Sequence, residues 1–167
     1  MSPRTTAPFR LEPLTAQHRV DEFSSGDAAI DAFLRASALA EQSMGLSSVT
    51  VALDPSADNG VVGYFTLSPL SIRIDPRILA TLGLAAVPYP SVGGYLLGRL
   101  GVQRHYQRRG IGQALVAVAI AQARQGRTGT GGVFIAVDPK DDSLVGWYER
   151  LGFVRLGLQT RRVVMRL

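Results

Sequence analysis

Hydrophobic and polar positions alternate along several short stretches of this chain, and between them hydrophobic residues recur at helical spacing. Apolar residues at positions 30, 33, 34 and 38 predict a helix from about Asp27 to Ser43, which Gly45 ends. The alternating stretches predict strands, as do the apolar runs at Tyr95–Val102 and Val133–Val137. These strands are expected at Phe9–Leu14, Val49–Leu53, Val61–Ser68, Tyr95–Val102, Val133–Val137, Phe153–Leu158 and Arg162–Leu167.

Glycine, proline and small polar residues divide these elements. Residues 54–60 (DPSADNG) predict a turn that makes a hairpin of the strands on either side. Pro76–Leu82 predicts a short helix with proline at its start. Leu84–Gly94 contains two prolines and a glycine pair, so we expect a loop that delivers the chain to the next strand.

Two further helices are expected in the C-terminal half. The first covers about Gly110–Gln125, and the second covers Ser143–Leu151 with Gly152 at its C-terminal cap. Gly126–Gly132 reads GRTGTGG, but it leaves a helix and enters a strand. That order is the reverse of a phosphate-binding P-loop, and the lysine of a P-loop is missing. We therefore expect a flexible connector there.

The order of these elements predicts an α+β fold with one mixed sheet and a central βαβ unit. No internal repeat or low-complexity tract divides the 167 residues, so a single domain over residues 1–167 is expected. The N-terminus lacks the apolar region of a signal peptide, and Arg99 interrupts the longest membrane-span candidate. We expect a soluble, cytoplasmic protein.

Composition narrows the chemistry. The chain has no cysteine and only two histidines, which excludes disulfides, a cysteine nucleophile and a histidine-rich metal site, so no metal is expected. The net charge is +5 and comes almost entirely from arginine, since Lys140 is the sole lysine. Arginine suits phosphate recognition, which is compatible with a nucleic acid or a phosphorylated ligand. Codon usage in a genome rich in G and C is the alternative explanation.

The strongest chemical signal is a basic, glycine-containing turn between a strand and a helix. It reads QRRGIG over residues 107–112. Gly110 and Gly112 lack a Cβ, so a ligand can approach their backbone closely. The N–H groups that start the following helix have no partner within it, and they meet the positive end of the helix dipole. The turn therefore predicts a site for a pyrophosphate.

This arrangement resembles the GNAT superfamily of acetyl-CoA-dependent N-acetyltransferases, whose signature is a hydrophobic strand, a Gln/Arg-x-x-Gly-x-Gly/Ala turn and a helix. Residues 147–153 (WYERLGF) match the family's helix-to-strand segment near the C-terminus. The resemblance implies a GNAT fold, in which a mixed central sheet with a βαβ acetyl-CoA-binding core is flanked by helices. It implies that acetyl-CoA contacts Leu100, Gly101, Val102, Gln107, Arg108, Arg109, Gly110, Ile111 and Gly112.

The resemblance also implies a mechanism. Pantetheine would lie along the strand at Leu100 and Val102 like an added β-strand, an amine would attack the thioester directly, and the CoA thiolate would leave. Tyr148 aligns with the tyrosine that protonates this thiolate in many members. A phenol with a pKa of about 10 stays protonated at neutral pH and can act as this acid. The alternative is a half-buried packing tyrosine, with Trp147 on the other helix face.

No residue stands out as a general base. His105 lies in the turn beside the expected phosphates, and Glu149 would point away from its neighbour Tyr148 on the helix. An α-amine has a pKa of about 8, which leaves a useful neutral fraction at pH 7 without any base. This consideration favours an α-amino acceptor over a lysine side chain.

The N-terminal half is similar to the GNAT toxins of type II toxin–antitoxin pairs. Residues 23–34 (FSSGDAAIDAFL) and 97–100 (LGRL) match family patterns, with Ser25 in place of the usual cysteine, Ile30 in place of leucine and Gly101 in place of alanine. The resemblance implies acetylation of the α-amino group of an aminoacyl-tRNA, which blocks translation. It also implies a ribbon-helix-helix antitoxin and a homodimer.

Several arginines could contact the tRNA backbone, although each could equally be an ordinary solvated side chain. The candidates are Arg35, Arg73, Arg77, Arg99, Arg161 and Arg162. Two other functions stay open. One is a GNAT that acetylates a small amine, a peptide N-terminus or a protein lysine. The other is a non-catalytic acetyl-CoA-binding module, which the retention of Tyr148 and of the whole turn disfavours.

Overall fold

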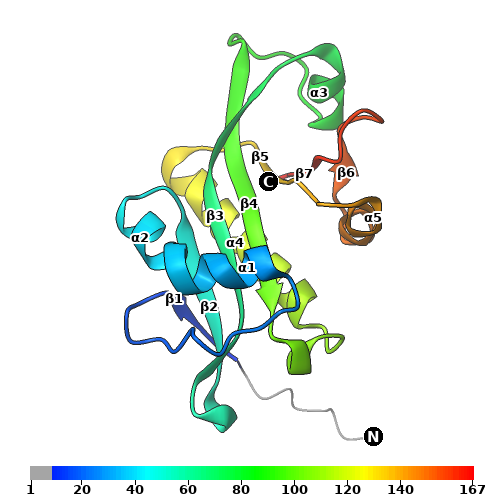
Figure 1. Ribbon diagram of the computed structural model, residues 1–167. Helices are drawn as coiled ribbons and strands as arrows, with labels where there is room; N and C mark the ends of the chain where they lie inside the picture. The colour runs from blue at the N-terminus through cyan, green and yellow to red at the C-terminus, as the bar shows by residue number, and fades with distance from the viewer. Residues whose placement is uncertain (1–8) are drawn as a thin grey trace, which may run out of the picture. The chain divides into compact units, whose positions relative to one another are not determined.

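The computed structural model describes residues 9–167, whose elements are labelled in Figure 1. Within these residues, seven strands form one sheet in the order β1-β2-β3-β4-β5-β7-β6. The β4–β5 pair is parallel, whereas β1–β2, β5–β7 and β6–β7 are antiparallel. The sheet is therefore mixed, as expected. The strands are Arg10–Pro13 (β1), Ser48–Asp54 (β2), Gly60–Arg73 (β3), Ser91–Val102 (β4), Phe134–Val137 (β5), Val154–Arg155 (β6) and Val163–Arg166 (β7).

The described chain forms two compact units. The first comprises residues 9–66 and 99–115, and the second comprises residues 67–98 and 116–167. Two strands and one helix pass from one unit into the other along the chain. They are β3, β4 and α4 (Ile111–Thr130).

The first unit contains the predicted N-terminal helix. Asp27 caps its start by accepting hydrogen bonds from the N–H groups of Ala29 and Ile30. The run consists of α1 (Ala28–Ala32), a π-helical turn η1 (Phe33–Ser37) and α2 (Ala38–Ser43). Gly45, with φ of 76°, follows its end. The helix is confirmed, whereas its wider π-helical centre has no signature in the hydrophobic spacing. The core of this unit includes Phe23, Phe33, Leu34, Val49, Val51, Leu53, Val61 and Tyr64.

The second unit is built on β4, β5 and β7. Ile135 of β5 pairs with Tyr95 of β4 on one side and with Met165 of β7 on the other. Phe134 and Val164 are buried in the core of this unit, together with Leu82, which follows α3 (Pro76–Thr81). The helix α5 (Asp142–Arg150) belongs to the same unit. The short helix predicted at Pro76 is thus confirmed.

The predicted loop over Leu84–Gly94 was too long, because β4 already begins at Ser91. The glycine pair belongs to this strand. The N–H of Val133 donates to the carbonyl of Gly93 at 2.9 Å. A Cβ on Gly94 would lie 2.5 Å from the carbonyl oxygen of Phe134 and 2.7 Å from its ring. Glycine is therefore present because the next strand packs against its backbone, and it does not mark a turn.

The flexible connector predicted at Gly126–Gly132 was wrong, since α4 continues to Thr130. A Cβ on Gly126 would lie 2.6 Å from the hydroxyl oxygen of Tyr95, so this glycine makes room for an aromatic ring. The Thr130 hydroxyl donates back to the Gly126 carbonyl within the helix at 3.0 Å. Gly131, with φ of 86°, ends the helix by donating to the Arg127 carbonyl.

Candidate active site

The turn predicted to bind an anion connects β4 to α4 through η3 (Arg104–Tyr106) and lies in the first unit. Residues 107–110 are exposed. Arg108 and Gly110 have φ values of 60° and 81°. Left-handed residues in a turn direct successive main-chain N–H groups toward one concavity, which suits an anion. No other atom lies within 4 Å of the position that a Cβ on Gly110 would occupy, so a ligand has access to this backbone.

The side chain of Gln107 is held within the protein. Its Nε2 donates to the carbonyl of Ser25 at 2.6 Å and to the carbonyl of Val102 at 2.9 Å. Both amide hydrogens are therefore directed at protein oxygens. In this conformation, Gln107 fixes where the turn begins, and the residues after it present their main chain to solvent.

The strand that leads into the turn packs closely against the N-terminal helical run. Gly101 is buried, and a Cβ on it would lie 2.6 Å from Cγ2 of Ile30 and 3.1 Å from Cε1 of Tyr64. This crowding explains why glycine replaces the alanine of the family pattern. Leu100 and Val102 are half-buried. The ladder between β4 and β5 ends at Leu97–Val137, before these residues.

Tyr148 lies on α5, whose start is capped by the side chain of Asp141 accepting the N–H of Leu144 at 2.9 Å. The side chain is 5% exposed, so it is buried and not half-buried as the packing alternative assumed. Its ring makes edge-to-face contacts with Trp147 and Phe153, with centroids 4.8 and 5.5 Å away. Desolvation by burial raises the pKa of Tyr148 well above its ordinary value.

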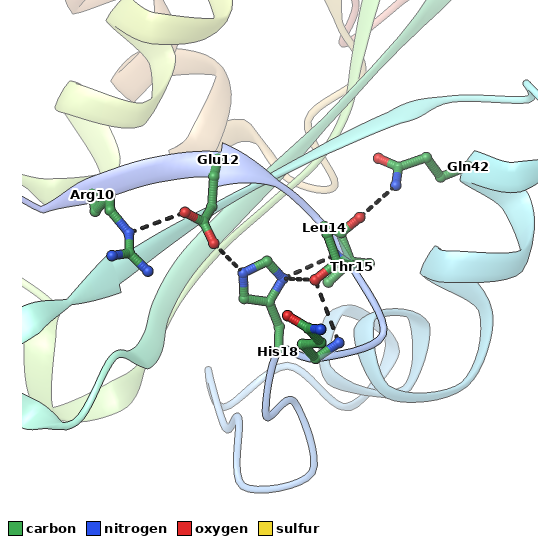
Figure 2. A network of polar contacts seen from close by, with 7 residues as sticks. Arg10, Glu12, Leu14, Thr15, His18 and Gln42 are labelled. Atoms are coloured by element: carbon green, nitrogen blue, oxygen red, sulfur yellow. Dashed lines mark hydrogen bonds and ion pairs between the residues drawn. The ribbon is translucent and has the colours of Figure 1, made fainter.

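The two residues considered as bases are both on the surface. His105 is exposed in η3, and Glu149 is exposed on α5. The other histidine, His18, is part of the polar network in Figure 2: its Nε2 and Glu12 Oε1 lie 2.6 Å apart, and its Nδ1 accepts the N–H of Thr15 at 2.9 Å. The hydrogen bond from His18 is the main reason that the pKa of Glu12 is lowered. This network holds the turn after β1.

The four arginines predicted to bind tRNA do not gather in one unit. Arg35 and Arg99 belong to the first unit, and Arg73 and Arg77 belong to the second. Arg35 donates to the carbonyl of Phe23, and the guanidinium of Arg99 stacks 3.7 Å from the ring centroid of Phe33. Arg73 and Arg77 are exposed.

The two arginines near the C-terminus are ion-paired. Arg162 forms two hydrogen bonds of 2.7 Å with Asp138, which raise the pKa of its guanidinium. Arg161 lies 3.3 Å from Asp142. These residues line a shallow groove of about 530 Å³ together with Pro139, Arg155, Leu158, Gln159 and Thr160.

Sequence reasoning missed the residues that hold the turn from outside. The Tyr106 hydroxyl donates to Oδ2 of Asp54 at 2.7 Å, and hydrogen bonds from Ser56 and Tyr106 lower the pKa of Asp54. On the other side, Ser25 binds Gln107 and is itself bound by Asp31. No local sequence pattern marks such contacts, because the partners are distant in the chain. Asp54 in β2 lies 52 residues from Tyr106, and Ser25 in the 24–27 loop lies 82 residues from Gln107.

No cluster of three or more His, Cys, Asp or Glu side chains within residues 9–167 could hold a metal ion. No helix in the same part of the chain combines the length and the apolar character needed to cross a membrane.

A sequence comparison decides the family. The family model of the acetyltransferase (GNAT) family matches residues 37–153, which include the strand, the turn, α4 and the segment around Tyr148. The chain belongs to the GNAT acetyltransferase family. As a GNAT enzyme it transfers an acetyl group from acetyl-CoA, and the exposed turn with its left-handed residues suits the pyrophosphate of this donor.

The GNAT relatives that it resembles include a tRNA-acetylating toxin of Mycobacterium tuberculosis (strain ATCC 25618 / H37Rv). The two are 31% identical over 134 residues, which make up 80% of this chain and 77% of the toxin.

Solved structures share the GNAT fold. AtaT complexed with acetyl-methionyl-tRNAfMet superimposes with a TM-score of 0.83 at 21% identity and covers 95% of each chain. A tyrosine-to-phenylalanine mutant of KacT has a TM-score of 0.84 at 18% identity, covering 95% of this chain and 94% of its own. AtaTR bound with acetyl-CoA has a TM-score of 0.81 at 22% identity, covering 95% and 93%.

Proposed function

We propose that this protein is a toxin that transfers the acetyl group of acetyl-CoA to the α-amino group of an aminoacyl-tRNA and so blocks translation. The observation that carries the proposal is the 31% identity to a tRNA-acetylating toxin over four-fifths of the chain. The fold shared with AtaT, which has been solved with an acetylated aminoacyl-tRNA, supports it. We propose that the reaction takes place in the cytoplasm, where charged tRNA is used.

The proposed donor site is the turn and the strand before it. The main chain from Arg108 to Gly112 would receive the pyrophosphate, because its N–H groups start α4 and two left-handed residues shape the turn. Leu100 and Val102 would guide the pantetheine, since the β4–β5 ladder ends before them. The thioester supplies an activated acetyl group, and the protein's part is to hold it and to stabilise the leaving thiolate.

Tyr148 is the proposed general acid. Its raised pKa keeps the phenol protonated throughout the neutral range, so Tyr148 has a proton to share as the C–S bond breaks and negative charge develops on sulfur. The acceptor amine needs no dedicated base, because an α-amine is partly neutral at pH 7. Arg35, Arg73, Arg77 and Arg99 are the proposed contacts to the tRNA backbone.

The proposed partners are inferred from the complexes of the same relatives. AtaT has been solved with the antitoxin AtaR, and KacTA has been solved with DNA. We propose that this chain is likewise neutralised by a small antitoxin of the ribbon-helix-helix type and that it forms a homodimer. Co-expression with a candidate antitoxin from a neighbouring gene should restore growth.

The test of the reaction uses acetyl-CoA with a labelled acetyl group and total charged tRNA. Label should appear on tRNA and should leave it when mild base hydrolyses the aminoacyl ester. Uncharged tRNA is the matched control, because it offers the same phosphates without an α-amine. Label found only on protein or small amines would assign this GNAT to the other acceptors.

A further inference from the structure

The 24–27 loop lies against the segment that starts the proposed donor site. The N–H of Ser24 donates to Oε1 of Gln103 at 2.6 Å, and the N–H of Arg104 donates to the Ser24 carbonyl at 2.9 Å. Nε2 of Gln107 donates to the Ser25 carbonyl at 2.6 Å. Three hydrogen bonds thus join segments that are 79 to 82 residues apart.

A buried carboxylate fixes this loop. Asp31 is 6% exposed, and its Oδ1 accepts hydrogen bonds from the Ser25 N–H at 2.8 Å and from the Ser25 hydroxyl at 2.6 Å. Hydrogen bonds to an ionised acceptor are shorter and stronger than neutral ones. Ser25 is therefore held from one side by Asp31, and on the other side its carbonyl holds Gln107.

The turn needs such support. Arg108 follows Gln107 directly and has φ of 60°, a region that a residue with a Cβ adopts only when its surroundings hold it there. Gln107 is the last residue before it with a side-chain hydrogen bond to the rest of the first unit. Losing the bond to Ser25 would leave the Gln107 side chain with the Val102 carbonyl alone and would loosen the start of the turn.

We propose that the Ser25–Asp31 pair acts through Gln107 to keep the 107–112 turn in the conformation that receives the pyrophosphate of acetyl-CoA. This inference rests on the proposed donor site. Ser25 and Asp31 are positioning residues, because they act through Gln107 and do not touch the donor. A serine hydroxyl is a stronger donor than the thiol that the family pattern carries at this place, so the departure at Ser25 strengthens the pair.

The test compares two acetyl donors that share the pantetheine, of which only acetyl-CoA carries the pyrophosphate and the nucleotide. Acetyl-CoA and acetyl-pantetheine compete with a fluorescent CoA for the wild-type protein and for the variants Ser25→Ala and Asp31→Ala. The variants should lose about tenfold in affinity for acetyl-CoA, the typical effect of losing a hydrogen bond to a charged group. Affinity for acetyl-pantetheine should stay within about twofold, because this donor has no pyrophosphate.

Gln42→Ala provides the matched control. Nε2 of Gln42 donates to the Leu14 carbonyl at 2.7 Å (Figure 2). Its Oε1 accepts the N–H of Val49, so this amide also bridges two segments of the first unit. Neither of these hydrogen bonds reaches the 24–27 loop or the turn. Loss of the amide should lower the melting temperature without changing the ratio of the two affinities. Asp31→Asn keeps an acceptor oxygen and should restore most of the ratio.

The outcomes separate the positioning role from the donor site itself. A wild-type protein that binds both donors equally would show that the turn holds no pyrophosphate, which overturns the donor site and the positioning role together. A strong wild-type preference that Ser25→Ala and Asp31→Ala leave intact, or an equal loss for both donors, overturns the positioning role alone. Neither readout needs an acceptor, so the result is independent of whether tRNA is acetylated.

Discussion

Tyr148 is buried, yet its hydroxyl is the group that the proposed reaction uses. Two aromatic neighbours hold the ring, and its protonated form is stabilised because the surroundings desolvate the phenolate. An acid that stays protonated above neutral pH still carries its proton when negative charge develops on a departing thiolate next to it.

The variant Tyr148→Phe removes this hydroxyl and keeps the ring contacts with Trp147 and Phe153. Turnover should fall by about 100-fold or more, the usual size of a lost general acid. The Kd for acetyl-CoA, measured by calorimetry, should stay within about twofold, since the proposed donor contacts lie on the turn. Tyr95→Phe is the matched control: it removes a hydroxyl that donates to the Gly131 carbonyl at 2.6 Å, and turnover should be retained. Full turnover in Tyr148→Phe would remove the acid assignment.

The raised pKa of Tyr148 also predicts the pH profile. The folded state favours the neutral phenol, so Tyr148 stays protonated until the pH exceeds its ordinary value of about 10. Initial rates should therefore rise as the acceptor amine loses its proton at about pH 8 and then level off up to about pH 9.5. Rates are corrected with enzyme-free samples, because the aminoacyl ester hydrolyses in base. A fall between pH 8 and 9.5 in a protein that stays folded would contradict this reading.

At the scale of single residues, the sequence indicates candidate chemical groups but not the contacts that hold them in place. The residues of the turn and Tyr148 stand in short patterns whose chemistry is legible along the chain. The Ser25–Asp31 pair and the Asp54–Tyr106 hydrogen bond could not be predicted, because each supports the turn through contacts between distant segments. The role of Gly101 was also invisible, since its lack of a Cβ matters only where Ile30 packs against it.

Among the elements, α4 contains two glycines that differ in the space around them. Gly126 and Gly129 both lie inside it. The ring of Tyr95 occupies the space next to Gly126, whereas nothing lies within 4 Å of the position of a Cβ on Gly129.

Alanine substitutions should therefore act in opposite directions at these two positions. Gly129→Ala should stabilise the protein by about 0.5–1 kcal/mol, because alanine favours a helix more than glycine does. Gly126→Ala should destabilise it by about 1–3 kcal/mol, because the added methyl group overlaps Tyr95. Denaturant unfolding measures both free energies. Equal stabilisation by the two variants would mean that Tyr95 does not pack against α4.

The elements themselves were mostly predicted correctly, and the boundaries at the start of β4 and the end of α4 failed for one common reason. Glycines at the start of β4 and at the end of α4 indicate loops in a sequence pattern. In the folded chain the same glycines admit Phe134 and Tyr95. Hydrophobic spacing records which residues are buried, but it does not record which backbone must lie close to a neighbouring ring.

At the scale of the whole molecule, the net charge of +5 comes from arginines that differ in whether an acidic side chain pairs with them. Arg10, Arg19 and Arg162 are ion-paired with Glu12, Asp58 and Asp138. Arg73 and Arg77, by contrast, are exposed and form no ion pair within residues 9–167. Both are therefore available to a polyanion.

Binding of tRNA should accordingly weaken as salt increases, and these arginines should carry part of the effect. The double variant Arg73→Ala/Arg77→Ala should reduce the slope of log K against log salt by about 1–2, as expected for two lost phosphate contacts. Filter binding over a salt series measures the slope. Arg10→Ala, which removes an ion-paired charge, is the control and should leave it unchanged. Binding that does not change with the salt concentration would exclude a surface that contacts phosphates.

The hydrogen-bonded Ser25 has one more consequence, because the chain contains no cysteine. The variant S25C would carry a single thiol, placed beside the Asp31 carboxylate. Its modification by a disulfide reagent would report how often the 24–27 loop opens, since a closed, carboxylate-bound thiol reacts slowly. Saturating acetyl-CoA should slow that reaction if the donor holds the turn closed. The rate of thiol labelling without acetyl-CoA would then measure how much of the time the turn is already held closed before the donor binds.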